Sequence, residues 1–483
     1  MIEIIVYIIV VIFVVMWCYF KWHNRPFEKL AARMPGPPAY PFIGTLYGCI
    51  GLTSGQIVSR ILDYVKDYNL EPFKFWMGPY FGVFIVKPED LQIVLNSSNA
   101  FQKGFVYDFF KVILGEGLFT APVDKWRIHR RMISPFFNGK LLEQFFPVFI
   151  EKNRILIRNV GKQLNETQVF NLWDYVAPFA LDVICENTMG YNLDTQTNKN
   201  ECEFAKAIVK FPLQVIKEKK AEFDQRKKLN DAKMDVTNSN EHQSKLFLDT
   251  LFELNNGGGN FSDSDIRDEV ITMLAAGSET NAITVCFCLL LLAIHQDIQD
   301  KVYDEIYDIF DESDHMISIE DTSRLVYLEQ VLKETLRLLP AAPFLLREIQ
   351  EDLKIFSSDY VLPKGTMCII SPLATHRSPD LYSNPRDFNP ENFSPENIAK
   401  RHRYSFIPFS GGPRGCIGSK YVMMVMKVTV STFLRHFSVH TNIKLTDIKL
   451  KLDVLMRSVD GYPVTIRPRD KRPTYKRNLN SLR

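Results

Sequence analysis

The segment Phe409-Ser-Gly-Gly-Pro-Arg-Gly-Cys-Ile-Gly418 is a glycine-rich loop that leads into an apolar helical stretch at residues 420–434. Cys416 stands where the loop becomes a helix, so amide donors and the positive helix end are expected to stabilise a thiolate and lower the pKa of the thiol. The glycines let the backbone approach a large flat ligand closely. Taken alone, the loop fits a buried structural cysteine equally well. A phosphate-binding loop is excluded, because Ser419-Lys420 reverses the Gly-Lys-Ser order.

Four further motifs precede this loop in the chain. They are Trp126-Arg-Ile-His-Arg130, Ala276-Gly-Ser-Glu-Thr280, Glu334-Thr-Leu-Arg337 and Phe388-Asn-Pro-Glu-Asn-Phe393. With the loop, which fits F-x-x-G-x-R-x-C-x-G at every fixed position, they resemble the cytochrome P-450 family in content and order. The resemblance covers essentially the whole chain. It implies a mainly α-helical fold with small β-sheets, haem b as cofactor, and haem-thiolate monooxygenase activity.

The resemblance also assigns a haem site. Cys416 would be the iron ligand, and a thiolate in this role donates electron density that favours O–O cleavage. The remaining cofactor-binding positions correspond to Trp126, Arg130, Arg347, Phe409 and Arg414. By the resemblance, the haem propionates would be held by Trp126, Arg130, Arg347 and Arg414. Arginine suits this task because its guanidinium fork pairs well with a carboxylate.

Two catalytic residues follow from the motif on the long helix. Thr280 would hydrogen-bond bound dioxygen, and Glu279 would connect it to solvent so that protons reach it. Without the cysteine loop, a Glu-Thr pair on a helix would be commonplace. The pair therefore carries weight only together with Cys416.

The chain departs from the family pattern at two places. Glu334 and Arg337, at i and i+3 on one helix, suit a buried ion pair. The family completes this network with an Arg where this chain has Asn392. We therefore expect the network, which acts as a brace in the core, to stabilise the fold less, without loss of haem. Short segments such as Gly117-Leu-Phe-Thr120 resemble those of the fatty-acid ω-hydroxylase clan and its insect relatives. That clan often carries a Glu that bonds covalently to haem where this chain has Ala276, so haem is expected to be bound non-covalently.

The composition excludes other classes of protein. The 483 residues are 46% hydrophobic, which is enough for a large core. The 58 Lys and Arg nearly balance the 56 Asp and Glu, which argues against a nucleic-acid binder. The eight cysteines include no C-x-x-C pair or zinc spacing and are predicted to be reduced.

The N-terminus is predicted to be a membrane anchor. Residues 4–20 form an uncharged apolar run near the short end of the length that spans a bilayer. Basic residues follow the run and none precedes it, which indicates a single-pass protein of the endoplasmic reticulum membrane with its catalytic domain in the cytosol. We predict an anchor at 1–25, a proline-rich extended strap at 26–45, and one haem-binding catalytic domain at 46–483.

Inside the catalytic domain, the longest expected helix begins near Ser262 or Asp263 and reaches His295, with an apolar second half that indicates a buried core helix. Polar residues 227–244 and 255–260 are interpreted as mobile surface connections. Short strands are expected near 81–86 and 360–365.

The leading functional hypothesis is NADPH-driven insertion of one oxygen atom into a lipophilic substrate. No flavin or dinucleotide motif is found, so a separate NADPH-dependent flavoprotein reductase is implied. Apolar candidates for the substrate pocket are Phe105, Phe109, Ile271, Leu274, Ala275, Phe344 and Leu345. Two alternatives stay open. One is an electron-independent isomerase or dehydratase of lipid peroxides, disfavoured by the Glu279-Thr280 pair, and the other is a non-enzymatic haem-binding protein, suggested by Asn392 and Gly415.

Overall fold

The protein is mainly helical with small sheets, as predicted. The computed structural model describes residues 2–40, 42–137, 139–165, 168–198, 211–233, 246–256, 261–311 and 315–470. The helices are α1 (Ile2–Arg33), α2 (Ser54–Asp67), α3 (Pro88–Asn96), α4 (Val106–Leu114), α5 (Val123–Ile133), α6 (Gly139–Gly161), α7 (Trp173–Met189), α9 (Phe211–Lys233), α10 (Phe247–Asn256), α11 (Asp263–Ile294), α12 (Gln296–Phe310), α13 (Ile319–Arg324), α14 (Val326–Leu338), α15 (Pro372–His376), α16 (Pro395–Ala399) and α17 (Ser419–His436).

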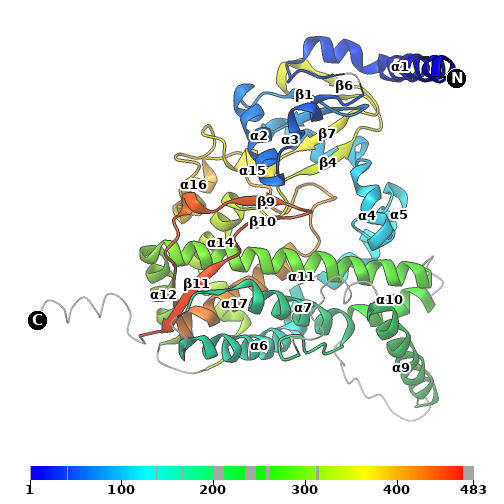
Figure 1. The fold of residues 1–483 in the computed structure, drawn as a ribbon. Helices are drawn as coiled ribbons and strands as arrows, with labels where there is room; N and C mark the ends of the chain where they lie inside the picture. The colour runs from blue at the N-terminus through cyan, green and yellow to red at the C-terminus, as the bar shows by residue number, and fades with distance from the viewer. Residues whose placement is uncertain are drawn as a thin grey trace, which may run out of the picture.

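The strands are β1 (Phe73–Met77), β2 (Tyr80–Ile85), β3 (Phe170–Asn171), β4 (Leu345–Glu348), β5 (Leu353–Lys354), β6 (Val361–Leu362), β7 (Met367–Ile370), β8 (Phe437–His440), β9 (Leu450–Leu452), β10 (Met456–Ser458) and β11 (Pro463–Pro468). The largest sheet lies in the upper part of the molecule in Figure 1, β9 and β10 lie near its middle, and β11 lies lower, beside α12. The largest sheet has the order β1-β2-β7-β4, in which β2 and β7 are parallel. In this sheet Arg347 of β4 pairs with Cys368 of β7.

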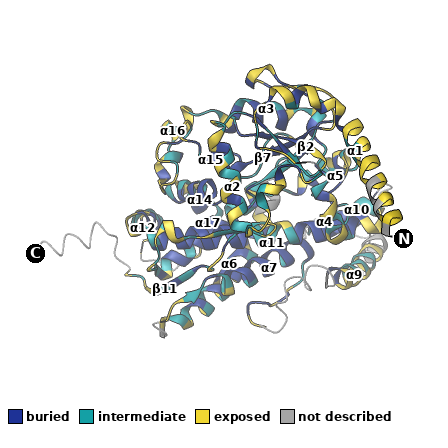
Figure 2. Ribbon diagram, turned by 45° about the horizontal axis from the view of Figure 1, so that its top comes forward, coloured by how far each residue is buried: buried dark blue, intermediate teal, exposed yellow. Residues whose placement is uncertain are grey.

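Helix α11 crosses the whole molecule (Figure 1), and its start agrees with the prediction. Ser262 is the N-cap and forms a capping box with Asp265, which satisfies amides that the first turn leaves free. Its 32 residues correspond to a length of roughly 50 Å. Among the described residues it is the helix long and apolar enough to cross a membrane, but 78% of its most apolar window is buried. The prediction of a buried core helix is confirmed (Figure 2).

Helix α1 continues beyond the predicted end of the anchor. It runs through Pro26 to Arg33, and only then does the chain become extended. The predicted strap boundary at residue 26 is therefore too early. The helix persists because Phe27 and Leu30 are buried against the sheet, with the rings of Phe27 and Phe81 5.1 Å apart. The first part of α1 instead exposes its apolar side chains (Figure 2).

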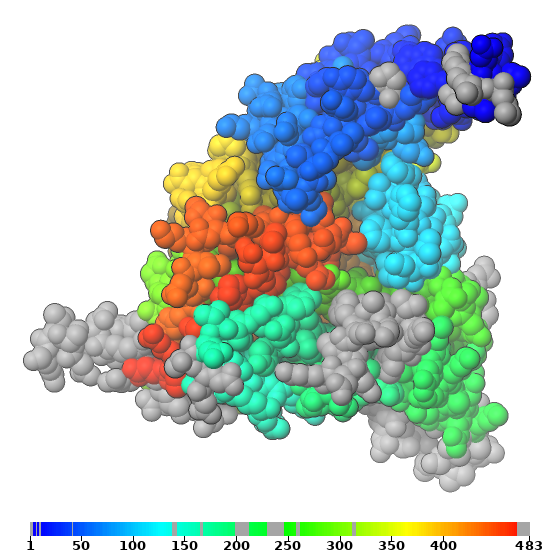
Figure 3. Space-filling view, in the orientation of Figure 1, coloured from blue at the N-terminus to red at the C-terminus, as the bar shows by residue number. Residues whose placement is uncertain are grey.

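Other connections also differ from expectation. The polar stretch predicted as a mobile connection begins inside α9, which continues to Lys233. Residues 234–244 and 257–260 lie outside the described residues. In the space-filling view, the α4–α5 segment (cyan) lies between the N-terminal part (blue) and the beginning of α11 (green) (Figure 3). Part of the candidate site lies on this segment, which places it against α11.

Candidate functional site

The glycine loop places Cys416 at the start of α17, as predicted. The Cys416 amide donates to the Phe409 carbonyl at 2.9 Å, and the Gly418 amide donates to the Cys416 thiol. Gly412 has a φ of 66°, and a Cβ there would collide with the carbonyl of Leu95. Only glycine fits this position without strain. The backbone geometry of the loop therefore fixes where the sulfur lies.

The predicted direction of the Cys416 pKa is wrong. The thiol is reached by solvent, yet the surrounding protein removes enough hydration that burial raises its pKa. The Gly418 amide, Arg130 and Lys103 lower it but do not outweigh burial. The amide and the cations thus act against the effect of burial at this position. A metal cation bound to the sulfur would hold it as a thiolate, because coordination deprotonates a thiol.

Four cations form a cluster that adjoins the thiol: Lys103, Arg130, Arg347 and Arg414. Arg130 and Lys103 act electrostatically on Cys416, while Arg347 and Arg414 act on Lys103. Across the described part of the chain, none of the four forms an ion pair with a carboxylate. Like charges placed together, with Arg347 and Arg414 buried, are costly unless an anion joins them. The two propionates of haem supply that charge, so the residues present fit the cofactor.

Arg414 is held by the backbone rather than by acids. Its two terminal nitrogens donate to the carbonyls of Phe101 and Ala121, and its guanidinium lies 4.9 Å above the ring of Trp126. Its Nε is buried without a partner within the protein. Burial first, and Arg347 second, lower the pKa of Arg414 to about 9. These carbonyls occupy two of the five N–H donors of the guanidinium, so donors remain for an anionic ligand.

Arg347 approaches from β4, where it is buried and interacts with the side chain of Tyr107 on α4. Lys103 stands beside it, with its Nζ 3.9 Å from the ring centre of Phe119. Burial and the positive charges of Arg347 and Arg414 hold the pKa of Lys103 well below its usual range. Lys103 was not predicted, because a single Lys outside any motif gives no local signal.

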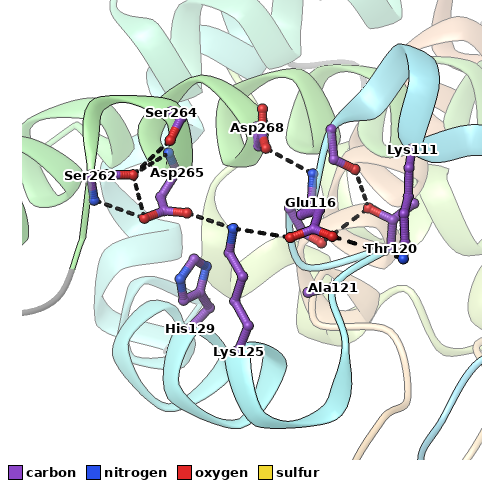
Figure 4. Close-up of polar contacts among 12 residues, drawn as sticks. Lys111, Glu116, Thr120, Ala121, Lys125, His129, Ser262, Ser264, Asp265 and Asp268 are labelled. Carbon is purple, nitrogen blue, oxygen red and sulfur yellow. Dashed lines mark hydrogen bonds and ion pairs between the residues drawn. The ribbon is translucent and has the colours of Figure 1, made fainter.

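Helix α5 presents two faces, and the acids of α11 hold one of them (Figure 4). Lys125 pairs with Asp265 at 2.6 Å, and His129 Nδ1 lies 2.7 Å from a Glu269 oxygen. Trp126 and Arg130, each one position further along the helix, thereby occupy the other face. The spacing i, i+4 within each pair explains how one short helix can both dock on α11 and contribute to the site.

The centre of α11 is locally accessible, although the residues on either side are buried. Ala276, Gly277, Glu279 and Thr280 interrupt its buried surface. The Thr280 hydroxyl donates to the Ala276 carbonyl at 2.6 Å, as a Thr in mid-helix commonly does. A Cβ at Gly277 would come within 2.8 Å of Ile184 on α7, so this glycine lets the two helices pack closely.

Glu279 has a partner that the sequence did not predict. It forms an ion pair with Arg457 of β10, and the two side chains are 22% and 28% exposed. The guanidinium of Arg457 in turn lies 4.6 Å above the ring of Trp173. Glu279 is therefore partly exposed and held by a guanidinium that itself packs on an aromatic ring.

The Glu334–Arg337 ion pair is present and fully buried, with Nε–Oε2 and Nη2–Oε1 distances of 2.7 Å. Asn392, where the family has Arg, still donates from Nδ2 to Glu334 at 3.1 Å. Arg401 reaches the same place, donates to the Asn392 carbonyl and stacks 4.4 Å above Tyr382. A second cation thus adjoins the network from a position that no motif indicated.

The predicted pocket residues do not all behave alike. Ile271 and Leu274 are buried in the core, and Phe105 stacks on Tyr80 with ring centres 4.0 Å apart. Phe109, however, is 71% exposed on α4, so it lies on the outer surface rather than in a closed pocket. No cluster of three or more His, Cys, Asp or Glu side chains suited to a metal occurs in the described residues. The seven described cysteines are free, as predicted, and Cys202 lies outside these residues.

Comparison with known proteins identifies the architecture. The family model for cytochrome P450 matches residues 34–211 and 203–462. Cytochrome P450 4V2 of Homo sapiens is 32% identical over 93% of this chain and 91% of its own. Cytochrome P450 4c21 of Blattella germanica is 32% identical over 93% and 96%, and cytochrome P450 4g15 of Drosophila melanogaster is 30% identical over 94% and 95%. The chain therefore belongs to the cytochrome P450 family of monooxygenases, in which its relatives carry family-4 names.

Proposed function

We propose that this protein inserts one atom of dioxygen into a C–H bond of a lipophilic substrate, using electrons from NADPH that a separate flavoprotein reductase delivers. The observation that carries the proposal is the site around Cys416. The Cys416 thiol lies near Arg130 and Lys103, and Arg347 and Arg414 adjoin Lys103. None of these four cations has a carboxylate partner in the described chain. This donor set suits a dianionic iron porphyrin better than any other common cofactor.

Cys416 would ligate the iron, and Trp126, Arg130, Arg347 and Arg414 would hold the propionates, joined by Lys103. Phe409, half-buried against the core, would lie beside the macrocycle. When bound, haem supplies the activation of dioxygen that amino acid side chains cannot provide. The chain supplies the sulfur, the positive charges and the exclusion of bulk water.

Thr280 and Glu279 would manage the protons. The Thr280 hydroxyl donates its hydrogen to the Ala276 carbonyl, so its oxygen can still accept a hydrogen bond. The hydroxyl must rotate before it can donate to a ligand. Glu279 would pass protons from solvent, and it pairs with Arg457. Release of this ion pair would let the carboxyl turn inward, which makes Arg457 part of the proton supply.

Replacing Thr280 by Val is expected to lower the amount of product formed per NADPH consumed by roughly tenfold or more, with the difference appearing as hydrogen peroxide. The hydroxyl that holds the proton is lost while the shape of the side chain is kept. Product, NADPH and peroxide are measured together. Thr284→Val is the matched control, since its hydroxyl also donates to a carbonyl one turn back, that of Thr280, but it is buried. Equal losses in both variants would contradict a special role of Thr280.

Haem is proposed to be bound without a covalent link. The methyl group of Ala276 cannot form the ester that a Glu at this position can form. Acid–acetone treatment of the purified protein is therefore expected to extract all haem into the organic phase. Haem that stays with the protein would contradict the proposal.

The protein is proposed to be held at the endoplasmic reticulum membrane by the apolar first part of α1, with the catalytic domain in the cytosol. The exposed apolar side chains there, among them Tyr7 and Phe13, support this. The basic residues that follow the apolar run support a cytosolic domain. The same placement would bring the domain to lipophilic substrates and to a membrane-bound reductase.

The test uses membranes that contain the full chain and an NADPH-dependent flavoprotein reductase, with isotopically labelled dioxygen and a panel of fatty acids and other lipids. The expected result is substrate-stimulated NADPH oxidation and one labelled oxygen atom in the product. Turnover of lipid peroxides without NADPH would favour an isomerase or dehydratase. Absence of both activities, with haem bound, would favour a haem-binding protein without catalysis.

A further inference from the structure

His376 links the buried ion pair to the cysteine loop. It is the last residue of α15 and is fully buried. Its carbonyl accepts from Arg337 Nη1 at 2.8 Å, and its ring Nε2 lies 2.8 Å from the amide nitrogen of Ile407. Ile407 is itself buried and stands two residues before Phe409. One residue therefore touches both the brace formed by Glu334–Arg337 and the entrance of the loop.

The contacts continue from Ile407 to the cysteine. The Ile407 carbonyl accepts from the Ser410 amide at 3.0 Å, which closes the first turn of the loop. The Phe409 carbonyl then accepts from the Cys416 amide at 2.9 Å. The contacts from Glu334 to Cys416 are thus continuous, and in the described part of the chain His376 supplies the side-chain acceptor for this stretch of backbone.

The chemistry of the Ile407 contact defines the state of the ring. An amide can only donate, so Nε2 must offer a lone pair and the ring must be neutral with its proton on Nδ1. Burial, together with the charges of Arg337 and Arg377, lowers the pKa of His376 to about 3, in agreement with a neutral ring. The backbone carbonyls of Arg337 and Leu336 also interact with the ring and oppose this lowering of the pKa, but burial outweighs them.

We propose that His376 is a positioning residue for the haem thiolate: by accepting the Ile407 N–H, it holds the entrance of the loop so that Cys416 presents its sulfur to the iron. The inference rests on the proposed function, because it requires Cys416 to be the iron ligand. It adds a residue that lies outside the cysteine loop and outside the E-x-x-R motif. Loss of the acceptor leaves a buried amide unsatisfied, and the loop can relieve this only by moving.

A purely packing role makes a different prediction. The His376 ring lies 5.2 Å from that of Phe406, so it also fills space in an aromatic contact. If packing were its only task, a side chain of similar volume without an acceptor would serve equally well. If the acceptor matters, a polar side chain that reaches the position of Nε2 is required.

The test compares His376→Gln, His376→Asn and His376→Leu in the full-length haem protein in membranes. The Gln carboxamide oxygen reaches about as far as Nε2, whereas the Asn oxygen falls short and Leu has no acceptor. After reduction with dithionite and addition of carbon monoxide, thiolate-ligated haem gives a strongly red-shifted Soret band and neutral-ligand haem does not. The ratio of the two bands is measured together with total haem.

We expect His376→Gln to keep a ratio close to that of the unaltered protein, while Asn and Leu shift it toward the neutral-ligand band by roughly 5- to 150-fold. Should His376→Leu not accumulate, the Gln and Asn variants decide. Gln no better than Asn, or Leu equal to the unaltered protein, overturns the inference. Failure of the proposed function looks different, because the unaltered protein would then lack a red-shifted band that depends on Cys416.

Discussion

Replacement of Cys416 by Ser is expected to abolish both the red-shifted Soret band of the reduced carbon monoxide complex and all monooxygenase turnover. Serine keeps the size of the side chain but offers a neutral oxygen in place of an anionic sulfur. The electron density that favours O–O cleavage is then missing. The Gly418 amide and the surrounding cations remain, so the variant separates the sulfur from its environment. The difference spectrum and substrate-dependent NADPH oxidation are measured on the same membranes.

Cys49→Ser is the matched control for this change. Cys49 is a free, half-buried cysteine in the short helical segment Thr45–Cys49, apart from the haem site. It is expected to leave both the band and the turnover intact. A red-shifted band that persists in Cys416→Ser would mean that another residue ligates the iron and that the site described here is wrong.

Arg337→Leu is expected to lower the free energy of unfolding by about 3–5 kcal/mol, because it leaves the fully buried Glu334 without its charge partner. It also removes donors to the carbonyls of His376, Pro385 and Asp387. We expect little holoprotein to accumulate at physiological temperature. Thermal or urea unfolding of the haem-free and haem-bound forms measures the loss.

Lys333→Ala provides the comparison on the same helix. Lys333 pairs with Glu329 at 2.7 Å on the surface of α14, where both side chains are about one-third exposed. Surface pairs of this kind contribute at most about 0.5 kcal/mol. If Arg337→Leu costs no more than Lys333→Ala, the buried network does not support the fold. Joint replacement of Glu334 and Arg337 by Leu should recover part of the loss, since no unpaired charge remains.

The replacement of the family Arg by Asn392 shows where motif reasoning loses accuracy. A missing cation predicted a weaker brace, and the network indeed contains a neutral amide at that position. The motif could not reveal Arg401, which lies nine residues further along the chain and donates back to the Asn392 carbonyl. Its guanidinium stacks on Tyr382 and is close enough to Glu334 for the two charges to interact.

Elements governed by local rules were predicted well. The start of α11 follows from Ser262 and the acids after it, and the cysteine loop follows from its glycines. The partners of Glu279 and Cys416 were not predictable in this way. Arg457 and Lys103 come from segments far away in the sequence, and neither carries a local pattern. The prediction of a lowered pKa for Cys416 failed for a related reason. A sequence shows where a helix begins or ends, but not how deeply that end is buried.

The continuity of α1 has a mechanical consequence. Its apolar first part and its last turns, which dock on the sheet through Phe27 and Leu30, belong to one continuous helix. A helix advances by about 1.5 Å and turns by about 100° with each residue. One residue inserted between Phe20 and Phe27 would therefore rotate the catalytic domain by roughly a quarter of a turn about the axis of α1. The number of residues in this short stretch therefore sets the orientation of the catalytic domain relative to the apolar first part of α1.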